Sequence, residues 1–507
     1  MRGFTWIDYG LLVFYITAVT VVGSWFAKDQ ASSRDFFLAG RNVSWIPMTL
    51  SVIATDFSSI SFLGVPGYIV AHDLQLELMQ FVFLWTLPLS LILFVRMFYR
   101  LELISAYEYL ERRFNLPLRT ACSLLFICIR LCWMATALYA TSLALTEMIG
   151  VPLWVSVAAM GGITALYSAL GGMKAVIWTD VAQFFVFSLA ILAVLAKTIG
   201  SVPGGLTTIW NIAEQRGHTR LASFGGGWES LTTPSILIGG SFLVLISYGV
   251  DQVVIQRYFA AKSIADIRRG MMFQASVNPL INWSLAVIGL SIFSFYTYFP
   301  ALLPAGLAPD KWFPYFIVHE LPTGLSGLVV AGMFAATMSS ISGGVNSLTA
   351  ACVVDFYRRF FLPPGQPIVS AVSVGAAAAG IEADRRELRI SRTLTLFWGV
   401  SASGLALVVG KIGAIALIAK TLSGFFGGVL LGVFLLGMLF RRVNGQGAFL
   451  GGAIGFVTIC IVGLKSSMNL FWYAPIGCGV TVGFGIVLSL LFSPAPAAKL
   501  EGLTLKM

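Results

Sequence analysis

Continuous apolar stretches, separated by short polar segments, recur along the whole chain. Each is about 20 residues long, which is the length that an α-helix needs to cross the hydrocarbon core of a bilayer. A transmembrane β-barrel would instead have short segments of alternating apolar and polar residues. The pattern predicts about 13 membrane-spanning helices, at 6–27, 45–71, 75–97, 118–148, 152–170, 175–197, 234–256, 270–298, 323–357, 391–410, 412–440, 446–464 and 470–493.

The composition excludes an ordinary soluble protein. Of 507 residues, 58% are hydrophobic and 11% are charged, whereas soluble proteins carry roughly 25% charged residues. The loops between the apolar stretches have room only for short surface helices, so residues 1–507 are expected to form a single membrane domain. We therefore predict an all-α, polytopic membrane protein.

The distribution of Lys and Arg predicts how the chain is oriented. Of 32 basic residues, 23 lie in one alternating set of loops, and loops rich in Lys and Arg face the cytoplasm. This count predicts an N-terminus outside and a C-terminus in the cytoplasm, in the inner cell membrane. The net charge of +10 does not indicate a nucleic-acid partner, because the basic residues lie at the ends of apolar stretches.

Polar residues inside an apolar stretch mark candidate sites, because they cost free energy unless they line a cavity or contact protein. The second stretch contains Ala-Thr-Asp-Phe-Ser-Ser-Ile-Ser at 54–61, followed by Gly64, Pro66 and Gly67. Hydroxyls and a carboxylate beside helix breakers indicate an unwound helix, whose free carbonyls are the hard ligands that an alkali cation needs. The alternative is a polar helix face that makes interhelical hydrogen bonds.

The ninth stretch carries a second group of hydroxyls. Ser339, Ser342 and Asn346 share one helical face, and Ala336 lies one turn earlier on the same face. Two adjacent hydroxyls, at Ser339 and Ser340, with a carbonyl one turn away have the chemistry to hold a dehydrated sodium ion. A seam of small residues for close helix packing would give the same pattern.

Among the charged residues within or at the edge of the apolar stretches, Asp180, Asp251 and Arg130 bear on the candidate sites. Asp180 would either attract a cation or pair with a basic loop, and the sequence favours neither. Asp251, six residues before Arg257, is expected to have a structural role. Arg130 must pair or face a cavity, and its partner cannot be identified from the sequence.

These segments, together with FFLAGR at 36–41, SAYEYLERRF at 105–114 and QVVIQRYFAAKS at 252–263, resemble the sodium:solute symporter family. This family includes sodium/glucose, proline and sialic acid symporters, and the bacterial sialic acid symporters are the most similar in appearance. The resemblance covers about residues 6–490. It implies a leucine-transporter-type fold with two inverted repeats of five helices, in which the second and seventh spans are broken. The extra N-terminal helix would be 6–27, the repeats 45–197 and 234–440, and the peripheral helices 446–493.

The resemblance also implies a sodium site. Its ligands would be the carbonyls of Ala54, Phe57 and Ala336 and the hydroxyls of Ser339 and Ser340. Some relatives have a second sodium site, to which Asp180 and Ser342 correspond here, but Gly343 stands where those relatives have a serine. One sodium ion per cycle is therefore expected, with no metal beyond sodium.

The implied solute site is formed by Asp56, Ser58, Ser61, Gln80 and Trp133. Sialic acid symporters have an arginine where this chain has Trp133, and that arginine would bind the carboxylate of the solute. An anionic Asp56 combined with Trp133 favours a sugar-like or amino-acid-like solute over a simple carboxylate. Arg130, one turn before Trp133, is an alternative partner for an anion.

The resulting hypothesis is a sodium-coupled symporter that imports a small organic solute by alternating access. Its partners would be the solute, sodium and the lipid bilayer, without nucleic acid. A sodium-coupled carrier of sialic acid or another carboxylate, a proton-coupled transporter and a sensor without transport are the alternatives. A membrane enzyme would need a cluster of His, Asp or Glu at a membrane face, and the sequence contains none. The identity of the solute and the oligomeric state stay open.

Overall fold

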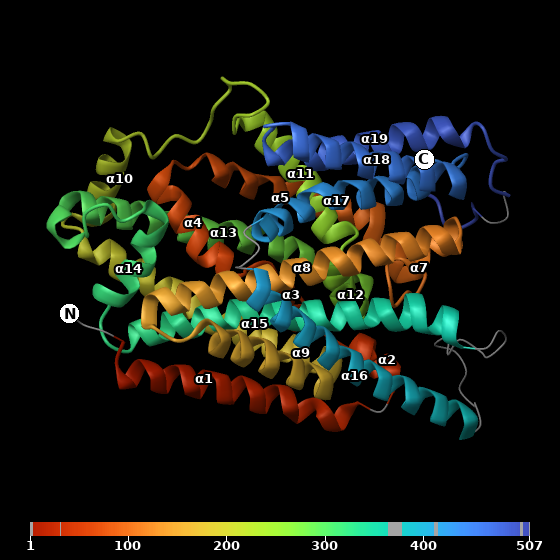
Figure 1. Ribbon diagram of the computed structural model, residues 1–507, viewed down its shortest axis with the longest axis horizontal. Helices are drawn as coiled ribbons and strands as arrows, with labels where there is room; N and C mark the ends of the chain where they lie inside the picture. Colours follow the sequence, from red (N-terminus) through yellow and green to blue (C-terminus); the bar gives the residue numbers. More distant parts are fainter. Residues whose placement is uncertain (1–3, 31, 363–377, 410–413, 497–499, 506–507) are drawn as a thin grey trace.

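The computed structural model describes residues 4–30, 32–362, 378–409, 414–496 and 500–505. Within these ranges the chain is helical, and its one β-type contact is an isolated bridge between Val43 and Ala261. The long helices run roughly side by side, with α1 (Trp6–Trp25) along one edge and α18 (Gly445–Lys465) and α19 (Tyr473–Ser489) along the opposite edge (Figure 1).

The α-helices differ widely in length. Their bounds are α1 Trp6–Trp25, α2 Ser33–Leu38, α3 Trp45–Asp56, α4 Ser59–Ala71, α5 Met79–Ser90, α6 Arg96–Arg100, α7 Glu108–Arg113, α8 Leu116–Ile149, α9 Leu153–Ser201, α10 Gly205–Gln215, α11 Thr233–Gly249, α12 Gln252–Phe259, α13 Ile264–Tyr298, α14 Trp312–His319, α15 Leu325–Ala351, α16 Ala378–Val409, α17 Ala414–Leu439, α18 Gly445–Lys465 and α19 Tyr473–Ser489. Short helical turns of other types adjoin them at Phe26–Asp29, Ala39–Arg41, Gln75–Leu78, Leu91–Val95, Pro300–Leu302, Pro309–Lys311, Cys352–Phe361 and Leu470–Trp472.

Nine helices of the described chain are long and apolar enough to cross a membrane. Two bent pairs, α3 with α4 and α11 with α12, bring the total to eleven if each pair is one span. The predicted spans 152–170 and 175–197 both fall within the 49-residue α9. The all-helical membrane architecture is confirmed, while the count of about 13 spans and the internal repeat stay predictions.

A glycine divides α9 into its two parts. Gly172 has φ +54°, in the left-handed region, and a Cβ at this position would lie 2.7 Å from the carbonyl oxygen of Phe36. Only glycine combines this backbone conformation with so close an approach. The second part of α9 carries Asp180, whose carboxylate contacts α3 and α15.

The core of the molecule is built around α15, which is buried along almost its whole length. Small residues allow its neighbours to approach closely. A Cβ on Gly332 would lie 2.9 Å from the Cβ of Ala190 on α9, and one on Gly344 would lie 2.3 Å from the sulfur of Met134 on α8. Figure 1 shows α15 between α8 and α9, in the middle of the bundle. The hydroxyl-bearing face of α15 therefore lies deep inside the protein.

Candidate sodium and solute sites

The helix formed by the second apolar stretch is broken in the middle. It bends by 56° between α3, which ends at Asp56, and α4, which begins at Ser59. Phe57 (φ −83°, ψ 108°) and Ser58 (φ −99°, ψ 164°) between them are extended. In the described chain the N–H of Ser58 does not reach the carbonyl of Ala54, as it would in a continuous helix. The break therefore leaves backbone carbonyls free for a ligand.

This break lies against α15. The hydroxyl of Ser340 donates to the carbonyl of Thr55 over 3.1 Å, and the hydroxyls of Ser339 and Thr55 are 3.3 Å apart. Ser339 and Ser340 are fully buried. Of the predicted sodium ligands, Ser339 and Ser340 thus contact Thr55 directly. Ala54 and Phe57 lie beside Thr55 at the break, and Ala336 lies one turn before the two serines on α15.

Asp180 lies directly behind this group and is fully buried. Its Oδ1 accepts hydrogen bonds from the hydroxyls of Ser339 at 2.8 Å and Ser342 at 3.3 Å. Its Oδ2 accepts from Ser51 at 2.5 Å and from the guanidinium of Arg257 at 2.8 Å. Asp180 and Ser342, predicted for a second sodium site, are therefore close together. An arginine already supplies the positive charge beside them.

Arg257 is held in place from several sides and is 1% exposed. Besides its ion pair with Asp180, it donates to the Ser51 hydroxyl and the Val253 carbonyl, each over 2.7 Å. A Cβ on Gly343 would lie 2.8 Å from one terminal nitrogen of the guanidinium and 3.0 Å from the other. Gly343 thus gives the guanidinium the space that any larger residue would occupy.

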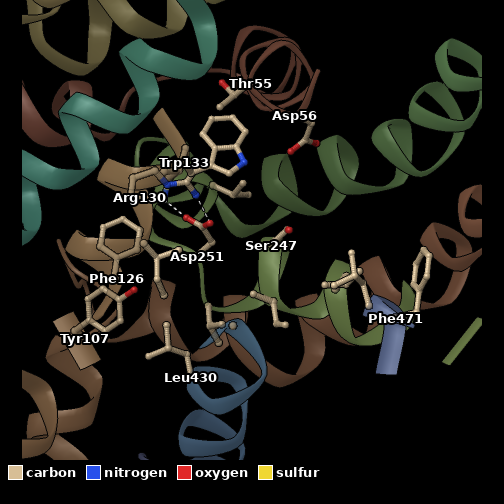
Figure 2. A pocket seen from close by; sticks show the side chains of 18 residues that line it. Thr55, Asp56, Tyr107, Phe126, Arg130, Trp133, Ser247, Asp251, Leu430 and Phe471 are labelled. Atoms are coloured by element: carbon tan, nitrogen blue, oxygen red, sulfur yellow. Dashed lines mark hydrogen bonds and ion pairs between the residues drawn. The ribbon is translucent and has the colours of Figure 1, made fainter. Parts of the chain in front are cut away.

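A cavity of about 440 Å³ lies beside the break. Of the predicted solute residues, Asp56 and Trp133 line it, together with Thr55, Arg130 and Asp251 (Figure 2). The other three lie outside its lining. Ser58 is the N-cap of α4, its hydroxyl accepting from the Ser61 N–H over 3.4 Å, and Gln80 is buried on α5 with no partner for its Oε1 among the described residues.

The carboxylate of Asp56 is fixed by donors from two other helices. Its Oδ2 accepts from the hydroxyl of Tyr248 on α11, from Gln274 over 3.1 Å and from Asn278 over 3.3 Å. Both amides of α13 also donate to the Tyr248 oxygen, over 2.9 and 3.0 Å. Sequence reasoning missed these three residues. The signal for two of them was present, because Gln274 and Asn278 lie one turn apart inside an apolar stretch.

A second charged pair faces the same cavity. Arg130 on α8 forms an ion pair with Asp251, which lies at the 47° bend between α11 and α12. Asp251 also caps α12, its Oδ1 accepting from the Val253 N–H over 2.9 Å. The guanidinium of Arg130 lies over the Trp133 ring, 5.2 Å from its centroid, as Figure 2 shows. The partner of Arg130, which the sequence left open, is therefore Asp251 rather than a residue of its own helix.

Comparison with known proteins places the chain in a transporter family. Residues 36–455 match the model of the sodium:solute symporter family. The sodium/sialic acid symporter NanT of Aliivibrio fischeri is 30% identical over 494 residues, which cover 97% of this chain and 94% of that protein. Human sodium-coupled monocarboxylate transporter 1 is 30% identical over 91% of this chain and 74% of its own.

Solved structures give the same result. A Na⁺-coupled sialic acid symporter, determined in a substrate-bound outward-open state, matches with a TM-score of 0.89 at 29% identity, over 97% of this chain and 99% of that one. MHP1, a transporter of the nucleobase-cation-symport-1 family, shares the fold with a TM-score of 0.54 at 12% identity. The chain is a member of the sodium:solute symporter family, a multi-pass membrane transporter family in which sodium is the coupling ion.

Proposed function

We propose that this protein imports a small organic solute together with sodium, by alternating access. The observation that carries the proposal is the broken α3–α4 helix: just before the break, the carbonyl of Thr55 accepts a hydrogen bond from Ser340 of α15 over 3.1 Å. Thr55 also lines the cavity beside the break. One broken segment thus touches both the candidate ion site and the candidate solute site, which is the arrangement that coupling requires.

The ion would bind between the break and α15. The carbonyls of Ala54, Phe57 and Ala336 and the hydroxyls of Ser339 and Ser340 supply five hard oxygen ligands of the kind that sodium prefers. In the structure the Ser340 hydroxyl spans to the Thr55 carbonyl. A bound sodium ion would take over this role and hold α3 against α15.

We propose that one sodium ion is carried per cycle. The guanidinium of Arg257 lies 2.8 Å from Asp180, against the position where a side chain on Gly343 would begin. A sodium ion at Asp180 and Ser342 would have to share this carboxylate with a guanidinium that is already there. The sodium ion and the guanidinium are both positive, and two positive charges at this short distance repel each other strongly in a buried site. A Hill coefficient near one for sodium-dependent uptake is the expected result.

One ion supplies enough free energy for accumulation. A unit charge that crosses a potential of 100 mV releases about 2.3 kcal/mol, and a tenfold sodium gradient adds about 1.4 kcal/mol. Together these terms would sustain roughly several hundredfold accumulation of the solute. In this proposal the N-terminus is outside, the C-terminus is cytoplasmic, and 45–197 and 234–440 are the two inverted repeats.

A sialic acid or another carboxylate is the second candidate solute. It is favoured by relatives that carry these solutes by name, the sodium/sialic acid symporters and the sodium-coupled monocarboxylate transporters. In this chain Arg130 is the arginine that faces the cavity, and it would have to bind the carboxylate while paired with Asp251.

The test is the thermal stability of the purified protein in sodium and in potassium at equal ionic strength, followed by uptake into proteoliposomes. We expect sodium to raise the melting temperature and to be required for uptake. Equal stability in both salts, with uptake driven by a proton gradient, would favour proton coupling. Sodium binding without uptake of any solute would favour a sensor.

A further inference from the structure

We propose that the solute is a zwitterion, a free amino acid with an apolar side chain, whose ammonium group binds Asp56 and whose carboxylate binds Arg130. This inference rests on the proposed function, because it names the class of solute that the cavity beside the α3–α4 break accepts. It follows from which oxygen and nitrogen atoms of the charged side chains already have hydrogen-bond partners in the protein and which do not.

Only one carboxylate oxygen of Asp56 has hydrogen-bond donors in the described chain. All its hydrogen bonds within the described chain go to Oδ2, from Tyr248, Gln274 and Asn278. Its Oδ1 has no partner among the described residues, and the side chain is partly exposed on the cavity wall. The three donors fix the carboxylate in one orientation, so that Oδ1 is a preformed acceptor for a cationic group such as an ammonium.

Arg130 presents unused donors on the same cavity. In the described chain Arg130 donates to the carboxylate of Asp251, whereas a guanidinium has five N–H donors. The rings of Trp133 and Phe126 hold the group, with centroids 5.2 and 5.9 Å away. Asp251 differs from Asp56 in that each of its oxygens already has a partner, since Oδ1 caps α12 and Oδ2 accepts from Arg130. The free donors of Arg130 therefore suit a carboxylate.

The summed charge of the cavity wall, the sodium ion and the solute differs between solute classes and favours one of them. Asp56, Arg130 and Asp251 together carry a formal charge of −1 on the cavity wall. A sodium ion at the break, next to Thr55 and Asp56, would bring this sum to zero. A zwitterion leaves the loaded site neutral, whereas a carboxylate alone or an amine alone leaves one net charge in a poorly solvated space. A neutral sugar keeps the balance but leaves the open atoms of Asp56 and Arg130 without charged partners.

The remaining wall suits an apolar side chain. Ile246, Val254 and Leu430 line the cavity, and aromatic rings of Trp133 and Phe471 complete it. A volume of about 440 Å³ is at the lower end of the range for small-molecule sites. In Figure 2, Asp56, Trp133 and Arg130 surround the same space. The wall therefore matches a solute that has charged groups at one end and an apolar side chain at the other.

The experiment measures solute binding to the purified full-length protein by thermal stability, in sodium and in potassium. The compounds are the standard amino acids, N-acetyl and amide derivatives of those that bind, short monocarboxylates, sialic acid and hexoses. We expect an apolar amino acid to raise the melting temperature in sodium. Blocking either its amine or its carboxylate should weaken binding at least about tenfold.

Variants test the assignment of each end. In Asp56→Asn the preference for the amino acid over its N-acetyl derivative should fall about tenfold, and in Arg130→Gln the preference over its amide should fall similarly. Glu214→Gln and Arg216→Gln, both exposed and away from the cavity, are the matched controls. Stabilisation of a variant by sodium shows that the variant is folded. The ratio of its affinities for the free and the blocked amino acid does not depend on how much protein is obtained.

The outcomes separate this inference from the proposed function. Sodium stabilisation with binding of a monocarboxylate, sialic acid or a hexose, and of no amino acid, would overturn the zwitterion and leave sodium symport in place. Binding of an amino acid equally in sodium and potassium would support the zwitterion and contradict sodium coupling. Blocked and free amino acids that bind equally would overturn the roles of Asp56 and Arg130.

Discussion

Two acid–base pairs lie close to the broken helices, and they differ in how completely they are enclosed. Asp180 and Arg257 are 0% and 1% exposed, and serine hydroxyls and a backbone carbonyl occupy their other atoms. Asp251 and Arg130 are 20% and 14% exposed and face a cavity. The first pair is closed to further ligands, whereas the second leaves donors open.

The degree of enclosure indicates whether a charged pair has a structural role or is available to bind a ligand. A buried charged group whose nitrogen or oxygen atoms each have a partner braces the elements that it joins, here α3, α9, α12 and α15. A charge that faces a cavity and keeps free donors is available to a ligand. The same two residue types therefore brace the candidate ion site in one place and face the candidate solute site in the other.

Breaking the closed pair should have the largest effect. Arg257→Gln would leave the Asp180 carboxylate buried without its counter-charge, which costs about 3–5 kcal/mol in comparable buried pairs. We expect loss of folded protein, measured by yield of monodisperse material and by melting temperature. The double variant Asp180→Asn with Arg257→Gln should recover part of the stability, and a single variant as stable as the parent would show that the pair is not a brace.

Crowding the closed pair should have an intermediate effect. In Gly343→Ser the new Cβ would lie 2.8 Å from the guanidinium of Arg257, which is held by Asp180, Ser51 and Val253 and has no free direction. Overpacking of this kind costs about 1–3 kcal/mol. Gly162→Ser is the matched control, because nothing lies within 4 Å of its Cβ, and equal melting temperatures for the two variants would contradict the packing described.

Removing a solvent-exposed ion pair should have the smallest effect on stability. Lys311 and Glu147 are 3.2 Å apart, and their side chains are 48% and 46% exposed. Solvent-exposed ion pairs contribute about 0–1 kcal/mol, so Lys311→Ala should change the melting temperature little. A loss comparable to that of Arg257→Gln would mean that enclosure does not decide the energetic role of these pairs.

The sequence predicted the helical membrane architecture and the position of the break, because both depend on local patterns. Apolar stretches of about 20 residues predict spans, and the polar run at 54–61 beside Gly64 and Pro66 predicts an interruption. The serines of α15 were identified in the same way, from their spacing on one helical face.

The partners of the charged residues could not be predicted, because each lies far away in the sequence. Arg130 pairs with a residue 121 positions away and Arg257 with one 77 positions away. Both choices depend on how the helices cross, which periodicity does not encode. Asp56 was singled out as a polar break in an apolar stretch, but its donors Tyr248, Gln274 and Asn278 come from two other helices. The sequence pattern therefore located polar residues that interrupt the apolar stretches, but not the distant partners that orient them.

If sodium binds between the α3–α4 break and α15, as proposed, a sodium titration of Ser340→Ala will detect the loss of one ligand. The matched control is Ser347→Ala, a buried serine on the same helix whose hydroxyl, among the described residues, bonds only to the carbonyl of Gly344 in α15, over 2.9 Å. We predict that the sodium concentration for half-maximal stabilisation and uptake rises about tenfold in Ser340→Ala, the equivalent of about 1.4 kcal/mol, and stays unchanged in Ser347→Ala. The same half-saturation in both variants would contradict the proposed sodium site.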